Sequence, residues 1–181
     1  MRVRRVEVTA TMSDGVVTLA PLCLNDVTDA YLSWLRDPDV IRFTEVYEPV
    51  DAMSLRAYIA NTMAAPDAAM WRIEHESRHV GNIRLSGINC LHRRAAVALM
   101  IGEKAIWGRG VGSAAIDLLA KHAFSFLGLH KLAAGIYSVN VASRRAFEKA
   151  GFHREATLRD NALFEGSFID VLLMARFAGA R

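Results

Sequence analysis

A glycine-rich segment is the clearest candidate for chemistry in this chain of 181 residues. Residues 107–113 read Trp-Gly-Arg-Gly-Val-Gly-Ser, and apolar residues at helical spacing follow from Ala114 to Phe124. A glycine-rich turn that opens a helix presents backbone N–H groups without intrahelical partners at the positive end of the helix dipole. Because such a turn binds phosphate or pyrophosphate, the segment predicts a ligand that carries phosphate.

The surroundings of the glycine turn exclude two common phosphate-binding motifs. No Lys-Ser or Lys-Thr pair follows Gly112, as a Walker loop requires. The predicted elements also lack the strict strand–helix alternation of a dinucleotide-binding domain. The turn therefore indicates another kind of α/β domain.

The periodicity of apolar residues places the turn between a buried strand and a helix. The strand covers residues 94–101 and the helix residues 110–126. Further strands are predicted over residues 16–22, 69–76, 79–85, 132–137, 152–158 and 168–175. Further helices are predicted over residues 25–35, 51–63 and 140–150, and Asp37-Pro38 is read as a helix breaker. The result is a mixed α/β domain with about seven strands and about four helices.

The composition is that of a globular protein, with 52% apolar residues, 23% charged residues and a net charge of +3. Apart from Arg2, Arg4 and Arg5, the basic residues are spread along the chain, which argues against a nucleic-acid partner. No apolar run approaches the ~18 residues of a membrane span, and no signal-peptide core follows the N-terminus. We therefore expect a cytoplasmic protein without a membrane partner.

The length suits a single domain over residues 1–181, with residues 1–13 as a flexible N-terminal extension. Cys23 and Cys90 lie far apart and show no metal-ligand spacing. This pattern predicts buried thiols in a reducing compartment and no metal site.

Two motifs together resemble the GNAT acyltransferase superfamily. The loop pattern Gln/Arg-x-x-Gly-x-Gly/Ala of that superfamily is similar to residues 107–112, with Trp107 at the first position. Its second pattern is matched by Asn140, Ser143, Phe147, Lys149, Gly151 and Phe152. Trp107, residues 140–145 and the opening segment 16–40 resemble the RimJ/RimL-type branch. The resemblance implies the GNAT fold and acetyl-CoA as the acetyl donor.

The resemblance also implies which residues contact the cofactor. In the family, the strand before the glycine turn diverges from the next strand, and the pantetheine arm lies in the gap. The implied contacts are Met100, Ile101, Trp107, Gly108, Arg109, Gly110, Val111, Gly112, Ser113, Asn140, Ser143 and Arg144. Without the family, Asn140 reads as a helix N-cap, and Ser143 and Arg144 as a solvated helix face.

Amine acetylation requires a neutral amine, a stabilised oxyanion and a thiolate that can leave. Many relatives place a Tyr four residues after the motif Ser to protonate the thiolate, and some place a Glu five residues before the motif Asn. This chain has Phe147 and Gly135 at those positions. Candidate substitutes are Tyr137, Glu103 and Glu74, whose ordinary alternatives are a core aromatic, a loop acid and an exposed strand residue. The histidines at 79, 122, 130 and 153 are assigned structural roles.

The acceptor is less well specified by the sequence. Residues 31–38, 81–95 and 165–171 resemble acetyltransferases of surface-polysaccharide pathways, which act on nucleotide-linked amino sugars. This analogy assigns substrate contacts to Trp34, Arg36, Arg42 and Arg84. Arginines suit a nucleotide diphosphate, and solvated surface arginines are the alternative.

Two other functions fit the same motifs. One is a RimJ/RimL-type acetyltransferase of protein N-termini such as that of a ribosomal protein, and the other is a non-catalytic acyl-CoA-binding module. The apolar residues 171–174 predict either a buried strand or an exposed edge that would support a homodimer.

Overall fold

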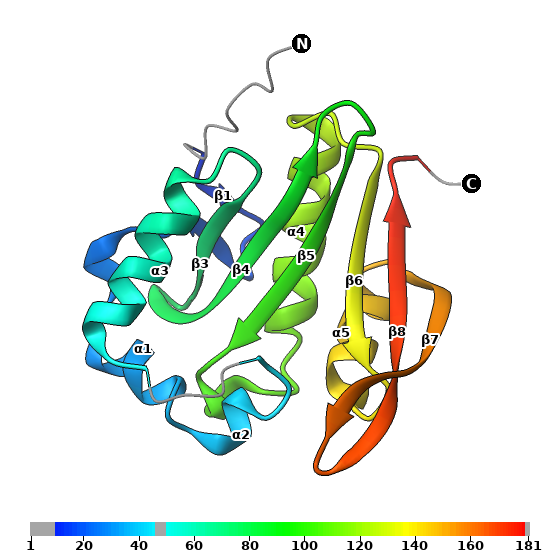
Figure 1. The fold of residues 1–181 in the computed structure, drawn as a ribbon. Helices are drawn as coiled ribbons and strands as arrows, with labels where there is room; N and C mark the ends of the chain where they lie inside the picture. The colour runs from blue at the N-terminus through cyan, green and yellow to red at the C-terminus, as the bar shows by residue number, and fades with distance from the viewer. Residues whose placement is uncertain (1–9, 46–49, 180–181) are drawn as a thin grey trace.

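An eight-stranded mixed sheet forms the centre of the computed structural model, which describes residues 10–45 and 50–179 (Figure 1). The strands are β1 (Met12–Ser13), β2 (Thr18–Pro21), β3 (Ala69–His75), β4 (Arg78–Asn89), β5 (Arg94–Ile101), β6 (Lys131–Tyr137), β7 (His153–Phe164) and β8 (Ser167–Phe177). Their order across the sheet is β1-β2-β3-β4-β5-β6-β8-β7. Only β5 and β6 pair in parallel within this sheet; the other neighbours are antiparallel.

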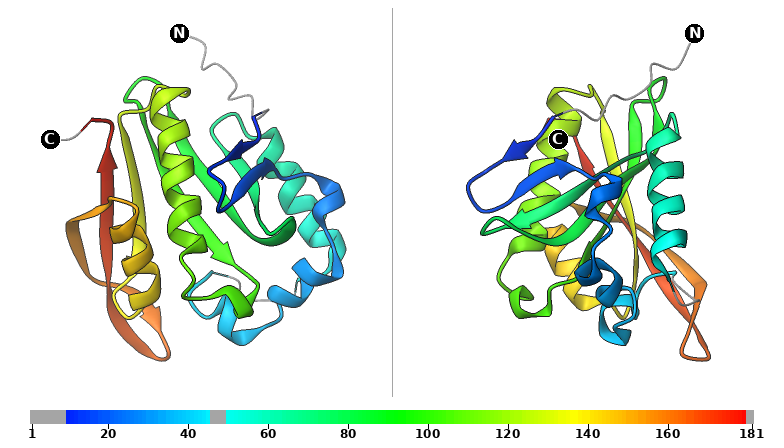
Figure 2. Two further views of the ribbon diagram at one scale, coloured as in Figure 1. Left: turned by 180° about the vertical axis from the view of Figure 1, so that it is seen from behind. Right: turned by 90° about the vertical axis from the view of Figure 1, so that its left-hand side faces the viewer.

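Helices cover both faces of the sheet (Figures 1 and 2). The α-helices are α1 (Asp29–Trp34), α2 (Pro38–Ile41), α3 (Ala52–Ala64), α4 (Val111–Ser125) and α5 (Val141–Lys149). Two short 3₁₀ turns, η1 (Leu24–Asp26) and η2 (Lys104–Ile106), complete the described elements. Helices α4 and α5 lie on one face, while α1, α2 and α3 lie toward the other. The predicted mixed α/β class is confirmed, with eight strands and five α-helices.

Two elements are additional to the predicted set. Helix α1 ends before Asp37-Pro38, as predicted, and this dipeptide also starts α2, because the Asp37 carboxylate accepts the Asp39 N–H at 3.0 Å and Pro38 suits a first helical position. Within the predicted extension 1–13, Met12 and Ser13 pair with β2 as strand β1. Residues 1–9 lie outside the described part of the chain.

Two further expectations, on residues 171–174 of β8 and on the cysteines, can be compared with the structure. Because β8 lies between β6 and β7, the side chains of Val171, Leu172 and Met174 are buried. Residues 171–174 are therefore core and not an exposed edge, which removes this segment as a reason for a dimer. Cys90 is exposed and Cys23 half-buried, both as free thiols, so the expectation of buried thiols is wrong.

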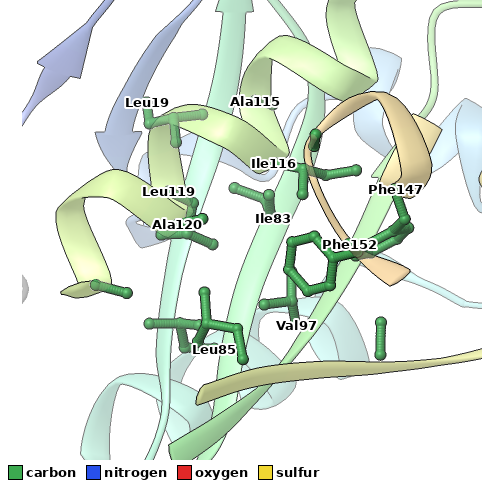
Figure 3. Close-up of a cluster of buried hydrophobic side chains, with 14 of the residues drawn as sticks. Leu19, Ile83, Leu85, Val97, Ala115, Ile116, Leu119, Ala120, Phe147 and Phe152 are labelled. Atoms are coloured by element: carbon green, nitrogen blue, oxygen red, sulfur yellow. The ribbon is translucent and has the colours of Figure 1, made fainter. Parts of the chain in front are cut away.

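The larger hydrophobic cluster fixes helix α4 against the sheet (Figure 3). Ile83 and Val97 from β4 and β5 pack with Ile116 and Leu119 from α4, and Phe152 closes the cluster below α5. A smaller cluster on the opposite face joins α1 and α3 to the sheet. Burial of such side chains contributes roughly 1.5–3 kcal/mol each. The packing therefore holds the first turn of α4 beside the end of β5.

Candidate functional site

The described structure has a cleft between β5 and β6. The two strands pair only from Arg94–Lys131 to Ala96–Ala133, and they diverge beyond that point, as Figure 1 shows. A cleft of about 920 Å³ opens there. Its lining includes β5 from Val97 to Met100 and β6 from Ala134 to Tyr137. The predicted divergence of the strand before the glycine turn is thus present.

The glycine turn lies between the end of β5 and the start of α4. Gly108 and Gly110 have φ values of 78° and 85°, a left-handed conformation that disfavours other residues. The Trp107 indole N–H donates to the Ile101 carbonyl at 3.0 Å, which ties the turn to β5. The Ser113 hydroxyl donates to the Gly110 carbonyl at 2.8 Å. All the predicted turn residues therefore lie at or just before the N-terminus of α4.

The N-terminus of α4 fits a pyrophosphate group. Its N-cap is Gly110, and in the described structure no side chain caps this helix. The backbone N–H groups of residues 111–113 consequently point outward at the positive end of the helix dipole. Arg109 is exposed beside them. Anions bind at such a helix start.

Lys149 adds a cation that sequence reasoning did not assign to the cofactor. Its Nζ lies 3.5 Å from the position that a Cβ on Gly110 would take. Lys149 ends α5, which packs against α4. In the sequence, Lys149 was marked only by its place in the second motif. Its closeness to Gly110 was not predictable from a local pattern, because the two residues are 39 positions apart.

Helix α5 begins at the cleft. The Asn140 side chain caps it by accepting the Ser143 N–H at 3.0 Å, and both residues line the cleft. Arg144 forms an ion pair with Glu148 at 3.7 Å and is not a lining residue. Phe147 is buried, lines the cleft and packs edge-on against Phe152. The helix-cap role of Asn140 and a place beside the cofactor are therefore compatible.

The three candidate catalytic residues occupy different places. Tyr137, at the end of β6, lines the cleft, and its ring packs edge-on against Phe164 with ring centroids 6.1 Å apart. Glu74 lies on β3 and pairs with Arg72 at 2.6 Å, outside the cleft lining. Glu103 caps η2 by accepting the Ala105 N–H at 3.2 Å, also outside the lining. Only Tyr137 of the three lines the cleft.

The four candidate substrate residues are also dispersed. Arg84 lines the cleft and donates to the Tyr58 hydroxyl at 2.7 Å. Trp34 is buried, and its ring covers Gly102 so closely that a Cβ there would overlap it. Arg36 is exposed outside the lining. Arg42 forms an ion pair with Glu165 at 2.9 Å, which joins the loop after α2 to the β7–β8 hairpin.

Glu45 is a second residue that sequence reasoning missed. It lines the cleft and also a side pocket of about 400 Å³. The cleft and the side pocket share Glu45, Gly135 and Tyr137, so these residues mark their junction. No local pattern distinguishes Glu45 from an ordinary loop acid, because its place beside Gly135 and Tyr137 depends on segments that are far apart in the chain.

A buried polar cluster supports the cleft from β4. The Nε2 atom of His79 lies 3.0 Å from both the Gly81 carbonyl and the Asn82 Oδ1, so it carries the proton and donates. Burial lowers the pKa of His79 despite these hydrogen bonds. The His79 ring also packs edge-on against Tyr31 and Trp34. Burial raises the pKa of the Tyr31 phenol far above its usual value, and nearby Tyr58 adds to this.

The family follows from a comparison with protein-family models. The model described as an acetyltransferase (GNAT) domain matches residues 17–153, which are most of the chain. The chain belongs to the GNAT acetyltransferase family. The match includes β5, the glycine turn, α4 and α5. The expectation that the chain is an enzyme of this class is confirmed by this match and by relatives named as N-acetyltransferases.

One curated relative of this GNAT chain is named as an N-acetyltransferase. The Bacillus subtilis protein "Probable N-acetyltransferase YjcK" is 35% identical over 103 residues, which are 55% of this chain and 55% of that protein. That match thus spans about half the length of the curated relative.

Two solved structures share the fold. The spermidine N-acetyltransferase from Vibrio cholerae, in complex with CoA and spermine, has a TM-score of 0.81 at 21% identity, covering 91% of this chain and 97% of that one. RimL, a ribosomal L7/L12 N-terminal acetyltransferase in complex with CoA, has a TM-score of 0.85 at 14% identity, covering 95% and 100%. At these identities the likeness shows the fold alone.

The described residues contain neither a membrane-spanning helix nor a cluster of metal-ligating side chains. No helix there is long and apolar enough to cross a membrane. No group of three or more His, Cys, Asp or Glu side chains there is arranged to hold a metal ion.

Proposed function

We propose that the chain is an N-acetyltransferase that moves the acetyl group of acetyl-CoA to a primary amine by direct attack in a ternary complex. The observation that carries this proposal is the divergence of β5 and β6 beside the uncapped N-terminus of α4. It puts the start of α4, a kind of helix end that suits phosphate, beside a cleft about 920 Å³ in volume, since a Cβ on Gly112 would lie 3.8 Å from Leu99 Cδ1 and Leu99 lines the cleft. The two fold neighbours are complexes with CoA, which supports the same donor.

The donor would lie along the glycine turn and into the cleft. Backbone N–H groups of residues 111–113, with Arg109 and Lys149, would hold the pyrophosphate. Asn140 and Ser143 would contact the pantetheine arm from the start of α5. On the other wall, the β5 backbone at Met100 faces the arm where β6 no longer pairs with it.

The reaction forms an N–C bond and breaks the thioester C–S bond, and the sulfur leaves as a thiolate that takes up one proton. Of the three candidates from the sequence, Tyr137 is the one that lines the cleft, and its phenol would supply that proton. The proton released by the amine nitrogen balances the one taken by sulfur. Holding donor and acceptor together would supply much of the acceleration, so the reaction does not depend on Tyr137 alone.

We favour a nucleotide-linked amino sugar as the acceptor. Arg84 lines the cleft on the wall formed by β4, and its guanidinium is held by Tyr58. A guanidinium binds phosphate through two N–H groups at once. The competing acceptors are a polyamine such as spermine and a ribosomal protein N-terminus, which are named with the two fold neighbours.

The test is a panel assay of CoA release with nucleotide-linked amino sugars, spermidine, and peptides that begin with Ala or Ser. Turnover of amino sugars is expected. Activity confined to the peptides would replace the favoured acceptor with a protein N-terminus. Calorimetry with acetyl-CoA provides the second measurement: binding without turnover of any amine would indicate a non-catalytic module, and no binding would overturn the proposal.

A further inference from the structure

The charges along the cleft carry an inference about the acceptor that rests on the proposed function and deepens it. Among the described residues that line the cleft, Glu45 and Arg84 are the two with a formal charge at neutral pH. The remaining lining residues are apolar or neutral polar. In a ligand site, a few charged groups on apolar walls set orientation and specificity. A ligand that satisfies both would carry one positive and one negative group.

Glu45 lines the cleft together with Tyr137, where we expect the acceptor amine to react. It shares the junction of the cleft and the side pocket with Gly135 and Tyr137 of β6. Gly135 has no side chain there, and a Cβ on it would be in van der Waals contact with Val171 Cγ1 at 3.5 Å. A carboxylate beside the aromatic ring of Tyr137 attracts an ammonium group by charge and by cation–π contact.

Arg84 lies on the other wall of the cleft. Its Nη1 donates to the Tyr58 hydroxyl of α3 at 2.7 Å, which orients the guanidinium before a ligand arrives. An oriented guanidinium loses less entropy when it binds a phosphate or carboxylate.

The strand register gives the backbone separation between Arg84 and the junction that Glu45 lines with Gly135. Arg84 pairs with Ala98 on β5, and Ala96 pairs with Ala133 on β6, which puts Gly135 level with Ala98. Two strand spacings therefore separate the backbones of Arg84 and Gly135, roughly 10 Å or more because β5 and β6 diverge. An α-amino acid, whose two charges are on neighbouring carbon atoms, cannot reach across this span.

We propose that the acceptor is a bipolar molecule whose primary ammonium binds at Glu45 and whose phosphate or carboxylate binds at Arg84, with a spacer of roughly 10 Å. The ammonium loses one proton to solvent before the neutral amine attacks. A nucleotide-linked amino sugar has this character. A polyamine has the wrong charge for Arg84, and an α-amino acid has too short a spacer.

The test uses a homologous series of ω-aminoalkyl phosphates, from aminoethyl to aminodecyl, as acceptors in the CoA-release assay. Alkylamines and diamines of the same lengths are the charge controls. Catalytic efficiency is expected to rise with chain length to a maximum near aminohexyl or aminooctyl phosphate, roughly tenfold above the matched alkylamine, because a hydrogen bond to a charged group strengthens binding by about that factor. The same series of ω-aminocarboxylates shows which anion is preferred.

Two variants locate the two groups. Arg84→Gln should remove the advantage of the phosphate while leaving alkylamines unaffected, and Glu45→Gln should raise the KM of every amine in the series. The KM of acetyl-CoA should change in neither. Arg78→Gln is the matched control, since Arg78 is an exposed arginine of the same strand that pairs with Glu76 outside the cleft.

The proposal is overturned if aminoalkyl phosphates are no better than alkylamines, or if Arg84→Gln weakens both alike. Calorimetric binding of aminooctyl phosphate to the CoA-loaded protein tests the same point without turnover. If this ligand binds in an Arg84-dependent way but no amine is acetylated, the proposed function fails while the bipolar site stands.

Discussion

Replacing Lys149 with Met tests whether the cofactor lies against α4 as proposed. The change keeps an unbranched apolar stem and removes the ammonium that lies beside Gly110. A charge-assisted hydrogen bond contributes about 1.5–3 kcal/mol when well shielded. Lys149 is exposed, and salt at physiological strength screens exposed charges. We therefore expect a loss of about 1 kcal/mol, which is about fivefold in the KM of acetyl-CoA.

The assay compares acetyl-CoA with S-acetylpantetheine, which lacks the phosphates. Lys149→Met should raise the KM of acetyl-CoA with kcat unchanged, because a contact equal in ground state and transition state affects binding alone. The KM of S-acetylpantetheine should not change. Lys121→Met is the matched control, since Lys121 is an exposed lysine of α4 that pairs with Asp117. An equal loss with both donors would refute the phosphate contact and indicate an effect through folding.

Two further predictions concern stability. Gly81→Ala should lower the free energy of unfolding by about 2–3 kcal/mol in urea titrations, because its Cβ would overlap the Met100 carbonyl oxygen and lie 3.0 Å from the Ile101 Cα. His79→Gln should flatten the acid side of the stability profile. Burial lowers the pKa of His79, so below its unfolded value near ~6.5 the unfolded chain binds more protons, and stability is lost as pH falls toward the folded value.

Matched controls distinguish these effects from general damage. Gly135→Ala, at a strand glycine with room for a Cβ, should cost little in stability; an equal loss at both glycines would contradict the overlap argument. His122→Gln should leave the His79 contribution in place, although burial lowers the pKa of His122 too. A profile unchanged by His79→Gln would contradict the linkage to His79.

The glycine turn and the helices around it were predictable because their signals are local. The left-handed conformation of Gly110, the cap at Asn140 and the apolar face of α4 each depend on a few neighbouring residues. The same local reasoning was incomplete at Asp37-Pro38: α1 does end before this dipeptide, but the dipeptide also starts α2.

The candidate site residues outside the turn were harder, because one residue type serves several roles. Arg42, Arg84 and Glu74 all suit a charged substrate by type. In the structure Glu74 is held by Arg72 and Arg42 by Glu165, while Arg84 lines the cleft. Which partner each charge meets depends on contacts between distant segments, and Arg42 and Glu165 are 123 residues apart.

The sequence by itself determined the family and the mixed α/β class, and it predicted a phosphate site at the start of α4, since glycine conformations, helix ends and strand periodicity depend on short stretches of chain. Tertiary structure decided what faces that place. It brought Lys149 to Gly110, placed both Glu45 and Arg84 in the lining of one cleft, and put Trp34 into the core over Gly102. These outcomes follow from side-chain packing and the divergence of β5 from β6, which no spacing along the chain encodes.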